Sequence, residues 1–268
     1  GMNQTASKKT VVLVYSGGLD TSICIPMMKE DYGYDHVVTV TVDVGQPAED
    51  IAQAAEKAKI MGTEHYTVDA KEEFAAEYCF RAVKANAMYE GYPLSTSIAR
   101  PLIAKRQIEI AKQVGADAVA HGATGKGNDQ VRFELTYYSL KPDIKVIAPW
   151  KMPEFLNRFR GRTDMIQYSE QHGIPIKASR KKPYSEDDNL LHISHEAGIL
   201  EDPGAPCAED IYSRTASLTK APDKADIISI TFKNGVPVKV ENQSGKVVTK
   251  PLQLFMYLNE LGTKHGIG

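Results

Sequence analysis

The chain has 268 residues, a length that suits one large domain or two smaller ones with a core that needs no disulfide or metal support. With 32 basic and 34 acidic residues the formal net charge is -2, which argues against a nucleic-acid-binding polycation. No apolar run approaches the roughly 18–20 residues of a membrane span. Three scattered cysteines lack the spacing of a zinc site or a disulfide framework. We therefore expect a soluble, cytoplasmic protein that binds neither nucleic acid nor membrane.

The first half of the chain alternates apolar runs with amphipathic segments. Continuous runs rich in β-branched residues predict buried strands over 10–15 and 36–44, and further strands are predicted over 65–68, 117–121 and 144–148. Apolar residues at helical spacing predict helices over 23–30, 47–61, 71–87 and 97–114. Strands that alternate with helices are typical of βαβ units. The expected fold class is therefore α/β, with a doubly wound, mostly parallel sheet.

The composition changes beyond about residue 175. Residues 183–222 are rich in Pro, Ser, Asp and Glu and show little periodicity. Two short runs, 227–232 and 238–241, flank Asn234-Gly235, which favours the positive φ angles of a type I′ hairpin turn. A last helix is predicted over 251–261. These features indicate a second, smaller α+β domain.

Three segments follow from these patterns. Residues 1–9 are expected to form a disordered tail, in which Gly1-Met2 is interpreted as a cleavage scar ahead of the native start. Residues 10–175 are expected to form the larger domain, and residues 176–268 the first part of a smaller domain. In open α/β sheets, ligands bind at the carboxyl ends of the strands. Candidate functional residues are therefore sought there.

The most informative string is Ser16-Gly-Gly-Leu-Asp-Thr-Ser22, between the first predicted strand and the first predicted helix. Two glycines allow a tight turn and a close approach by a ligand, and the start of the helix offers free N–H groups to an anion. The hydroxyls of Ser16, Thr21 and Ser22 add donors. The string predicts a cradle for a phosphate or pyrophosphate. The alternative is an ordinary turn in which Ser16 or Asp20 caps the helix.

A second polar segment follows the fourth predicted strand. Three glycines occur within residues 122–127, and polar side chains are frequent over residues 124–132: Thr124, Lys126, Asn128, Asp129 and Arg132. Backbone amides and both signs of charge at the end of a buried strand favour ligand binding over a flexible solvated loop. We expect this segment and the first loop to share a cavity.

Both strings resemble known families. Residues 16–22 resemble the PP-loop of the ATP pyrophosphatases, which cleave ATP to AMP and pyrophosphate while they adenylate a substrate. The string from His121 to Glu134 resembles the signature of the argininosuccinate synthase family. Four further strings match the same family: 15–22, 96–101, 146–150 and 192–200. The resemblance extends from Val11 to Gly268.

This resemblance implies a ligase of arginine biosynthesis and the urea cycle that condenses citrulline with aspartate through a citrullyl-adenylate, with ATP and Mg²⁺ as cofactors. It also implies the adenine nucleotide alpha hydrolase-like fold for the first domain and a homo-oligomer, a tetramer in full-length members. Phosphoryl transfer of this kind depends on positioning and charge stabilisation. We therefore expect no covalent residue, and no fixed protein ligand for Mg²⁺, which enters with ATP.

The resemblance also assigns site residues. Those expected to bind ATP are Val14, Tyr15, Ser16, Gly17, Gly18, Leu19, Asp20, Thr21, Ser22, Val42 and Gly122. Those expected to bind aspartate are Thr124, Asn128 and Asp129. Those expected to bind citrulline are Tyr92, Ser97, Asn128, Arg132, Ser185 and Ser194. Asp20 and Asp129 are the expected catalytic residues.

The chemistry of these residue types agrees with the assigned roles. Asn128 and Thr124 can hydrogen-bond carboxylates, and Asp129 can pair with an ammonium group. The planar guanidinium of Arg132 can hold a carboxylate through two hydrogen bonds.

Several candidates have structural alternatives. Ser97 can instead be the N-cap of a helix over 98–114, and Ser185 can cap a turn. Asp20 can cap its own helix or help to hold Mg²⁺. His121 can be a general base, although a histidine that closes a buried strand is more often hydrogen-bonded structure.

Family members continue past the equivalent of Gly268 with V-E-N-R and G-x-Y-E-T-P segments, each carrying a citrulline-binding residue, and a helical arm used in tetramer assembly. The sequence stops before these segments, so we expect it to be part of a longer chain. A tRNA-thiolating PP-loop enzyme is the alternative activity; unpaired cysteines and the net charge of -2 argue against it. A regulatory nucleotide-binding module is the alternative without catalysis.

Overall fold

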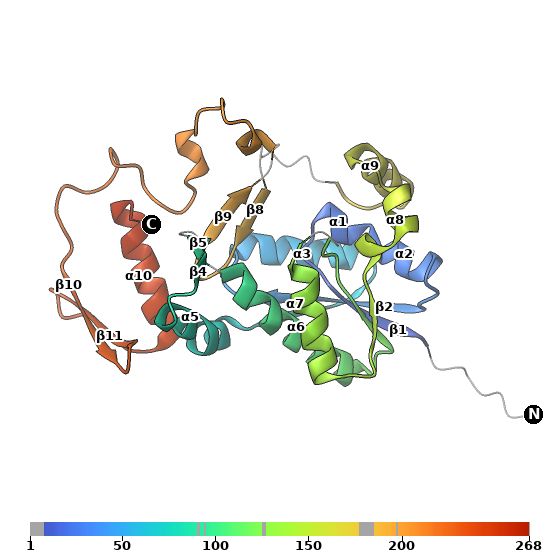
Figure 1. Ribbon diagram of the computed structural model, residues 1–268, viewed down its shortest axis with the longest axis horizontal. Coiled ribbons are helices and arrows are strands. Elements are labelled where there is room, and N and C mark those ends of the chain that lie inside the picture. The colour runs from blue at the N-terminus through green and yellow to red at the C-terminus, as the bar shows by residue number, and fades with distance from the viewer. Residues whose placement is uncertain are drawn as a thin grey trace, which may run out of the picture. The chain divides into compact units, whose positions relative to one another are not determined.

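The computed structural model describes residues 8–89, 92–93, 95–124, 127–176, 185–196 and 198–267 (Figure 1). The chain divides into two compact units. The first unit comprises residues 1–69 and 100–178, and the second comprises residues 70–99 and 179–268. Residues 70–99 therefore belong with the second unit, whereas the sequence placed them in the nucleotide-binding domain. Most of the expected tail, residues 1–7, lies outside the described residues.

The first unit is built on a parallel sheet of five strands with the order β3-β2-β1-β6-β7. The strands are β1 (Thr10–Val14), β2 (His36–Asp43), β3 (Glu64–Asp69), β6 (Ala118–Ala120) and β7 (Lys145–Ile147). All five were predicted, within a few residues at each end. The predicted α/β class and parallel sheet are confirmed.

The strand order places a topological switch point between β1 and β6. Val12 of β1 is in register with Val38 of β2 on one side and with Val119 of β6 on the other. The chain moves outward from β1 to β2 and β3, then crosses back to β6 and continues to β7. The segments that follow β1 and β6 thus leave neighbouring strands at the same edge of the sheet, where ligands bind in such folds.

Helices cover the sheet of the first unit (Figure 1). They are α1 (Leu19–Ser22), α2 (Cys24–Glu30), α3 (Ala48–Ile60), α6 (Ser95–Val114, whose first five residues belong to the second unit), α7 (Asp129–Leu140), α8 (Pro153–Arg158) and α9 (Arg162–Gln171), with a 3₁₀ turn at Pro149–Lys151. Val11 and Leu13 of β1 belong to one buried core with side chains of α2, α3, α8 and α9. Burial of each such aliphatic side chain contributes about 1.5–3 kcal/mol.

A buried polar side chain lies on the sheet at the switch point. Gln107 of α6 is fully buried, and its Nε2 donates to the carbonyl oxygens of Val12 and Ala120, at 2.9 Å each. The hydroxyl of Tyr137 in α7 donates to Gln107 Oε1. Gln107 therefore ties β1, β6 and α7 to one side chain.

The second unit contains small antiparallel sheets and one long helix. Its strands are β4 (Met88–Tyr89), β5 (Tyr92–Pro93), β8 (Ser185–Asp188), β9 (Ile193–Glu196), β10 (Ile228–Lys233), β11 (Val236–Asn242) and β12 (Val247–Val248). Its helical segments are α4 (Lys71–Glu73), a π-helical segment (Phe74–Cys79), α5 (Phe80–Lys84), α10 (Pro251–His265), and 3₁₀ turns at Gly198–Glu201 and Glu209–Ile211.

The predicted hairpin of the second unit is confirmed. Strands β10 and β11 pair around Asn234 and Gly235, which have φ angles of 52° and 76°. Both central residues of a type I′ turn require positive φ. The helix that follows runs four residues further than the predicted end at residue 261 and terminates at left-handed Gly266.

Aromatic packing explains why residues 70–99 belong to the second unit. Phe80 is buried in a core with Val240, Leu254 and Tyr257. Its ring also stacks on Phe255 of α10, with a distance of 4.8 Å between ring centroids. The segment therefore buries its apolar side chains against β11 and α10. Among the described residues, no helix is long and apolar enough to cross a membrane.

Candidate functional site

The loop after β1 takes its shape from Gly17. Its φ angle is +81°, and a β-carbon built on it would lie 3.1 Å from the Cα of Ala54 in α3. A side chain is therefore excluded both by the backbone conformation and by the packing of α3. The ammonium group of Lys57, also in α3, donates to the Gly17 carbonyl oxygen at 2.8 Å. Helix α3 thus packs against the loop through Ala54 and places the Lys57 ammonium group beside it.

Hydrogen bonds within the loop connect Ser16, Gly18 and Thr21. The Gly18 N–H donates to Ser16 Oγ at 3.3 Å, and Thr21 Oγ1 donates to the Gly18 carbonyl oxygen at 3.3 Å. The hydroxyl oxygens of Ser16 and Thr21 lie 3.4 Å apart. Gly18 is the N-cap of α1 and has no side-chain cap. Neither Ser16 nor Asp20 is therefore the N-cap residue, so the geometry does not favour the simple capping interpretation.

The hydroxyl of Ser22 does not face the loop, contrary to the expectation that it adds a donor for phosphate. It lies 2.8 Å from the hydroxyl of Tyr15, and both side chains are buried. Burial raises the pKa of Tyr15, and the hydrogen bond with Ser22 acts in the opposite direction. Thr41 donates to the Tyr15 carbonyl oxygen at 2.6 Å. Tyr15 and Ser22 therefore join the strand to the helix, and their N–H groups donate to the carbonyl oxygens of Val40 and Gly18.

Asp20 lies in the first turn of α1 with an exposed side chain. Desolvation by its surroundings raises the pKa of Asp20, and the positive charge of Arg162 opposes the rise. The Asp20 carbonyl oxygen accepts hydrogen bonds from Trp150 Nε1 at 3.2 Å and from Cys24 Sγ at 3.3 Å. The backbone of Asp20 is thus held, and its carboxylate is left at the surface.

Val14 and Val42 lie at the ends of adjacent strands. Val14 ends β1 and is half-buried, and Val42 is buried near the end of β2. Leu19, which is also half-buried, packs against the core of the first unit. These residues supply the apolar surface next to the loop.

The segment after β6 begins with His121, which is fully buried. Its ring stacks on Phe133, with centroids 5.4 Å apart. Its Nδ1 accepts from the Ala123 N–H at 3.2 Å, and its Nε2 lies 3.3 Å from a carboxylate oxygen of Glu134. Burial lowers the pKa of His121, although Glu134 acts to raise it. The geometry supports a hydrogen-bonded structural histidine rather than a general base.

Gly122 brings this segment into contact with the first loop. A β-carbon built on Gly122 would lie 2.6 Å from the Thr21 Cγ2 atom, closer than real carbon atoms approach. The two glycine-containing segments therefore meet at the switch point, as their positions after β1 and β6 require. They form the candidate functional site of the first unit.

Asp129 and Arg132, in the first turn of α7, form an ion pair. Arg132 Nη1 lies 2.7 Å from Asp129 Oδ1, and Arg100 Nε, from α6, lies 3.1 Å from Asp129 Oδ2. Thr124 and Asn128 are exposed, and Asn128 is the N-cap of α7. Of the expected aspartate-binding residues, Asn128 and Asp129 therefore lie at the start of α7, and Thr124 lies in the segment that precedes it. No pattern in the sequence predicts the pairing of Arg100 with Asp129.

The expected citrulline-binding residues other than Asn128 and Arg132 lie in the second unit. Ser97 lies in the first turn of α6, which begins at Ser95, so it is not the N-cap of that helix. Tyr92 is in β5 and Ser185 is in β8, but their side chains lie outside the described residues. Ser194, in β9, lines a cavity of about 640 Å³ together with His192 and Arg214.

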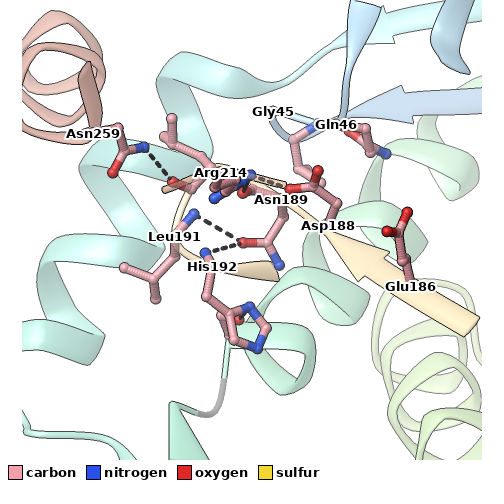
Figure 2. Close-up of polar contacts among 12 residues, drawn as sticks. Gly45, Gln46, Glu186, Asp188, Asn189, Leu191, His192, Arg214 and Asn259 are labelled. Carbon is pink, nitrogen blue, oxygen red and sulfur yellow. Dashed lines mark hydrogen bonds and ion pairs between the residues drawn. The ribbon is translucent and has the colours of Figure 1, made fainter. Parts of the chain in front are cut away.

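The turn between β8 and β9 is held by a cluster of hydrogen bonds (Figure 2). Asn189 Oδ1 accepts from the N–H groups of Leu191 and His192, at 2.9 and 3.3 Å. The guanidinium of Arg214 contacts the Asp188 carboxylate and the Asn189 carbonyl oxygen. Asn259 of α10 donates to the carbonyl oxygen of Leu190 at 2.9 Å. The hairpin that carries Ser185 and Ser194 is thereby anchored within the second unit.

A metal site made by the protein alone is not found in the described part of the chain. No group of three His, Cys, Asp or Glu side chains there could hold a metal ion. Asp20 is the exposed carboxylate in the loop after β1.

Two family models match the chain. The first, described as the arginosuccinate synthase N-terminal HUP domain, matches residues 10–175. The second, described as the arginosuccinate synthase C-terminal domain, matches residues 184–268. These matches agree with the sheet topology of the first unit and with the presence of a second unit.

Curated relatives named argininosuccinate synthase are similar over nearly the whole chain. The protein of Thermotoga maritima is 55% identical over 97% of this chain. Those of Mus musculus and Homo sapiens are 54% and 53% identical over 98% of it. The chain spans 64% of the length of each of these relatives.

Proposed function

Because the chain belongs to the argininosuccinate synthase family, we propose that it carries the nucleotide-binding part of a ligase that condenses L-citrulline with L-aspartate at the expense of ATP. AMP and pyrophosphate are the other products. The contact between Gly122 and Thr21 is the observation that carries this proposal. It supports a single nucleotide site built from both loops, as the transfer of an inner phosphorus requires.

In this proposal the loop from Ser16 to Thr21 holds the β- and γ-phosphates of ATP. Two glycines give the phosphates access to the backbone, the Ser16 hydroxyl can donate to a phosphate oxygen, and the Thr21 hydroxyl can do so once it releases the Gly18 carbonyl oxygen. Lys57 adds positive charge behind the loop. Val42, at the end of β2, offers an apolar surface to the adenine ring, and Gly122 lets the nucleotide pass close to the second loop.

The reaction proceeds in two steps. The ureido oxygen of citrulline attacks the α-phosphorus, and the bond from that phosphorus to the bridging oxygen breaks, so that pyrophosphate leaves with the bonding electrons. The aspartate amine then attacks the ureido carbon, loses a proton, and displaces AMP. Both steps depend on position and charge rather than on a covalent protein intermediate. The role of the chain is therefore to align three substrates.

Asp129, Asn128, Thr124 and Arg132 are suited to align the amino acids. The carboxylate of Asp129 can receive the ammonium group of aspartate before it reacts. Thr124 and Asn128 can donate to its carboxylates, and Arg132 can hold the citrulline carboxylate through two hydrogen bonds. The resemblance to the family also assigns citrulline contacts to Tyr92, Ser97, Ser185 and Ser194, which belong to the second unit.

Mg²⁺ fits this arrangement as a companion of ATP. It prefers oxygen ligands and is commonly bound by one or two carboxylates together with substrate phosphates. Asp20, with its exposed carboxylate in the first turn of α1, could add one oxygen ligand to the phosphates that carry the metal. Bound there, the metal would neutralise charge on the departing pyrophosphate.

Family membership also supports a homo-oligomeric, cytoplasmic enzyme of arginine biosynthesis. The net charge of -2 does not favour a tRNA substrate, which is the alternative activity. Sequence identities of 53–55% to synthases across bacteria and mammals support the condensation reaction over a regulatory binding module.

The route of one oxygen atom tests the proposal. Citrulline labelled with heavy oxygen in its ureido group is incubated with ATP and aspartate, and the products are analysed by mass spectrometry. The label should appear in AMP, because the ureido oxygen bonds to the α-phosphorus and leaves with it. Unlabelled AMP would contradict the citrullyl-adenylate route. Pyrophosphate release that requires tRNA would favour the alternative enzyme, and ATP binding without release would favour a binding module.

A further inference from the structure

The carboxylate of Asp129 lies between two arginines that come from different helices. Arg132 follows it by three residues in α7 and contacts Oδ1 at 2.7 Å. Arg100 belongs to α6 and contacts Oδ2 through Nε at 3.1 Å. The three side chains are 24–31% exposed, so that each ion pair is partly shielded from water. Each carboxylate oxygen therefore has its own cationic partner.

The two arginines are not equivalent in the proposed function. Arg132 is the proposed partner of the citrulline carboxylate, so its contact with Asp129 competes with that role. Arg100 has no assigned substrate. It reaches Asp129 from α6, so its charge-assisted hydrogen bond holds the carboxylate from outside the helix that carries Asp129.

Arg100 leaves Asp129 able to bind a cation. A carboxylate offers about four lone-pair sites, and a single hydrogen bond from each arginine occupies two of them. An ammonium group can therefore approach the same carboxylate while Arg100 stays in place. The geometry requires only that the carboxylate keep its orientation.

We propose that Arg100 is a positioning residue that holds the Asp129 carboxylate ready to receive the ammonium group of the amino-acid substrate. This inference rests on the proposed function, in which Asp129 binds aspartate. It assigns to Arg100 an indirect role, exerted through Asp129, rather than a contact with substrate.

The first experiment compares Arg100→Met with a matched control on the same helix. Arg106 is paired with Glu109 at 2.9 Å and lies outside the candidate site, so Arg106→Met is the control. Loss of a charge-assisted hydrogen bond should raise the KM for L-aspartate about tenfold or more in Arg100→Met. The KM for citrulline and kcat at saturating aspartate should stay close to those of Arg106→Met. An unchanged KM for aspartate would overturn the inference. Equal impairment of the aspartate KM, the citrulline KM and kcat would also overturn it.

Succinate distinguishes positioning from direct contact, because it carries both carboxylates of aspartate but lacks the ammonium group. Its inhibition constant against aspartate should be the same in the wild type and in Arg100→Met. A weakening of succinate equal to that of aspartate would mean that Arg100 binds a substrate carboxylate, and the proposal would fail. In an Asp129→Asn background, Arg100→Met should cause no further rise in the aspartate KM.

Calorimetry separates this inference from the proposed function. L-aspartate and succinate are titrated into the protein with citrulline and a non-hydrolysable ATP analogue bound. Preferential binding of L-aspartate that depends on Arg100 would support the inference even if no turnover occurred, in which case the proposed function alone fails. Turnover with aspartate binding independent of Arg100 overturns the inference alone. No preference for L-aspartate in the wild type overturns both.

Discussion

The backbone of Gly122 lies against the side chain of Thr21, so closely that a β-carbon at residue 122 would be 2.6 Å from Thr21 Cγ2. One residue follows β6 and the other follows β1, and more than a hundred positions separate them in the sequence. This contact joins the two glycine-containing segments into one site. Even a methyl group at residue 122, the smallest side chain, would therefore collide with Thr21.

Gly122→Ala should therefore weaken ATP binding. Accommodating the methyl group requires Thr21 to move, and overpacking of this kind costs about 1–3 kcal/mol, or roughly tenfold in affinity. Thr21→Ser removes Cγ2 and keeps the hydroxyl, so adding it to Gly122→Ala should restore most of the affinity. Calorimetry with ATP measures both. Gly161→Ala is the control, because nothing lies within 4 Å of its added carbon; equal losses in Gly161→Ala, or no rescue, would refute the steric explanation.

Lys57→Met should also weaken ATP binding. The Lys57 ammonium donates to the Gly17 carbonyl oxygen at 2.8 Å, so the substitution removes both a cation and a support of the loop. A charge-assisted hydrogen bond is worth about 1.5–3 kcal/mol, which corresponds to at least a tenfold loss. Lys59→Met is the control, because Lys59 is exposed on the same helix. ATP affinity that responds equally to both substitutions would show that only net charge matters.

Gln107→Leu should destabilise the first unit rather than change the site directly. Gln107 Nε2 donates to the carbonyl oxygens of Val12 and Ala120, and Gln107 Oε1 accepts a hydrogen bond from the Tyr137 hydroxyl. Leucine would remove all three of these buried hydrogen bonds, at a cost of about 2–4 kcal/mol in unfolding free energy. Urea denaturation measures the change. Gln113→Leu, at an exposed position of the same helix, should stay within about 0.5 kcal/mol of wild type; a similar loss in both would contradict this role of Gln107.

The buried His121 should make stability fall on acidification. Burial lowers the pKa of His121 below its usual value of 6.5. On acidification the unfolded chain therefore binds a proton at His121 before the folded chain does. The contribution to stability is present above the unfolded pKa and is lost as the pH falls below it. His121→Gln, which does not titrate, should show a smaller decrease in unfolding free energy between pH ~7.5 and ~5.5 than wild type. Equal decreases in the two proteins would assign the pH dependence to other groups.

Local patterns were enough to predict the sheet, the position of both loops and the β10–β11 hairpin. Buried parallel strands are continuous apolar runs, and Asn234-Gly235 takes the positive φ angles that few other residues tolerate. Helix α7 was not predicted, because Phe133 and Tyr137 are its only buried residues and charged side chains alternate with them. Such a helix depends on tertiary contacts more than on its own pattern.

The pairings within the site could not be predicted from the sequence. Arg100 meets Asp129 because α6 and α7 pack on the same sheet, and nothing in the spacing of the two residues indicates it. The hydroxyl of Ser22 pairs with Tyr15, since Ser22 is buried at the end of α1. Sequence motifs predict which residue types lie at one edge of the sheet. The direction of each side chain depends on packing between helices and strands that are distant in the chain.

Hydrogen exchange in the presence of Mg-ATP tests most directly whether both loops form one nucleotide site. Peptides that cover residues 16–22 and 118–124 should exchange more slowly on addition of the nucleotide, and should do so over the same concentration range. The hairpin of β10 and β11 should be unaffected at those concentrations. Protection of only one of the two segments, or of neither, would contradict the account.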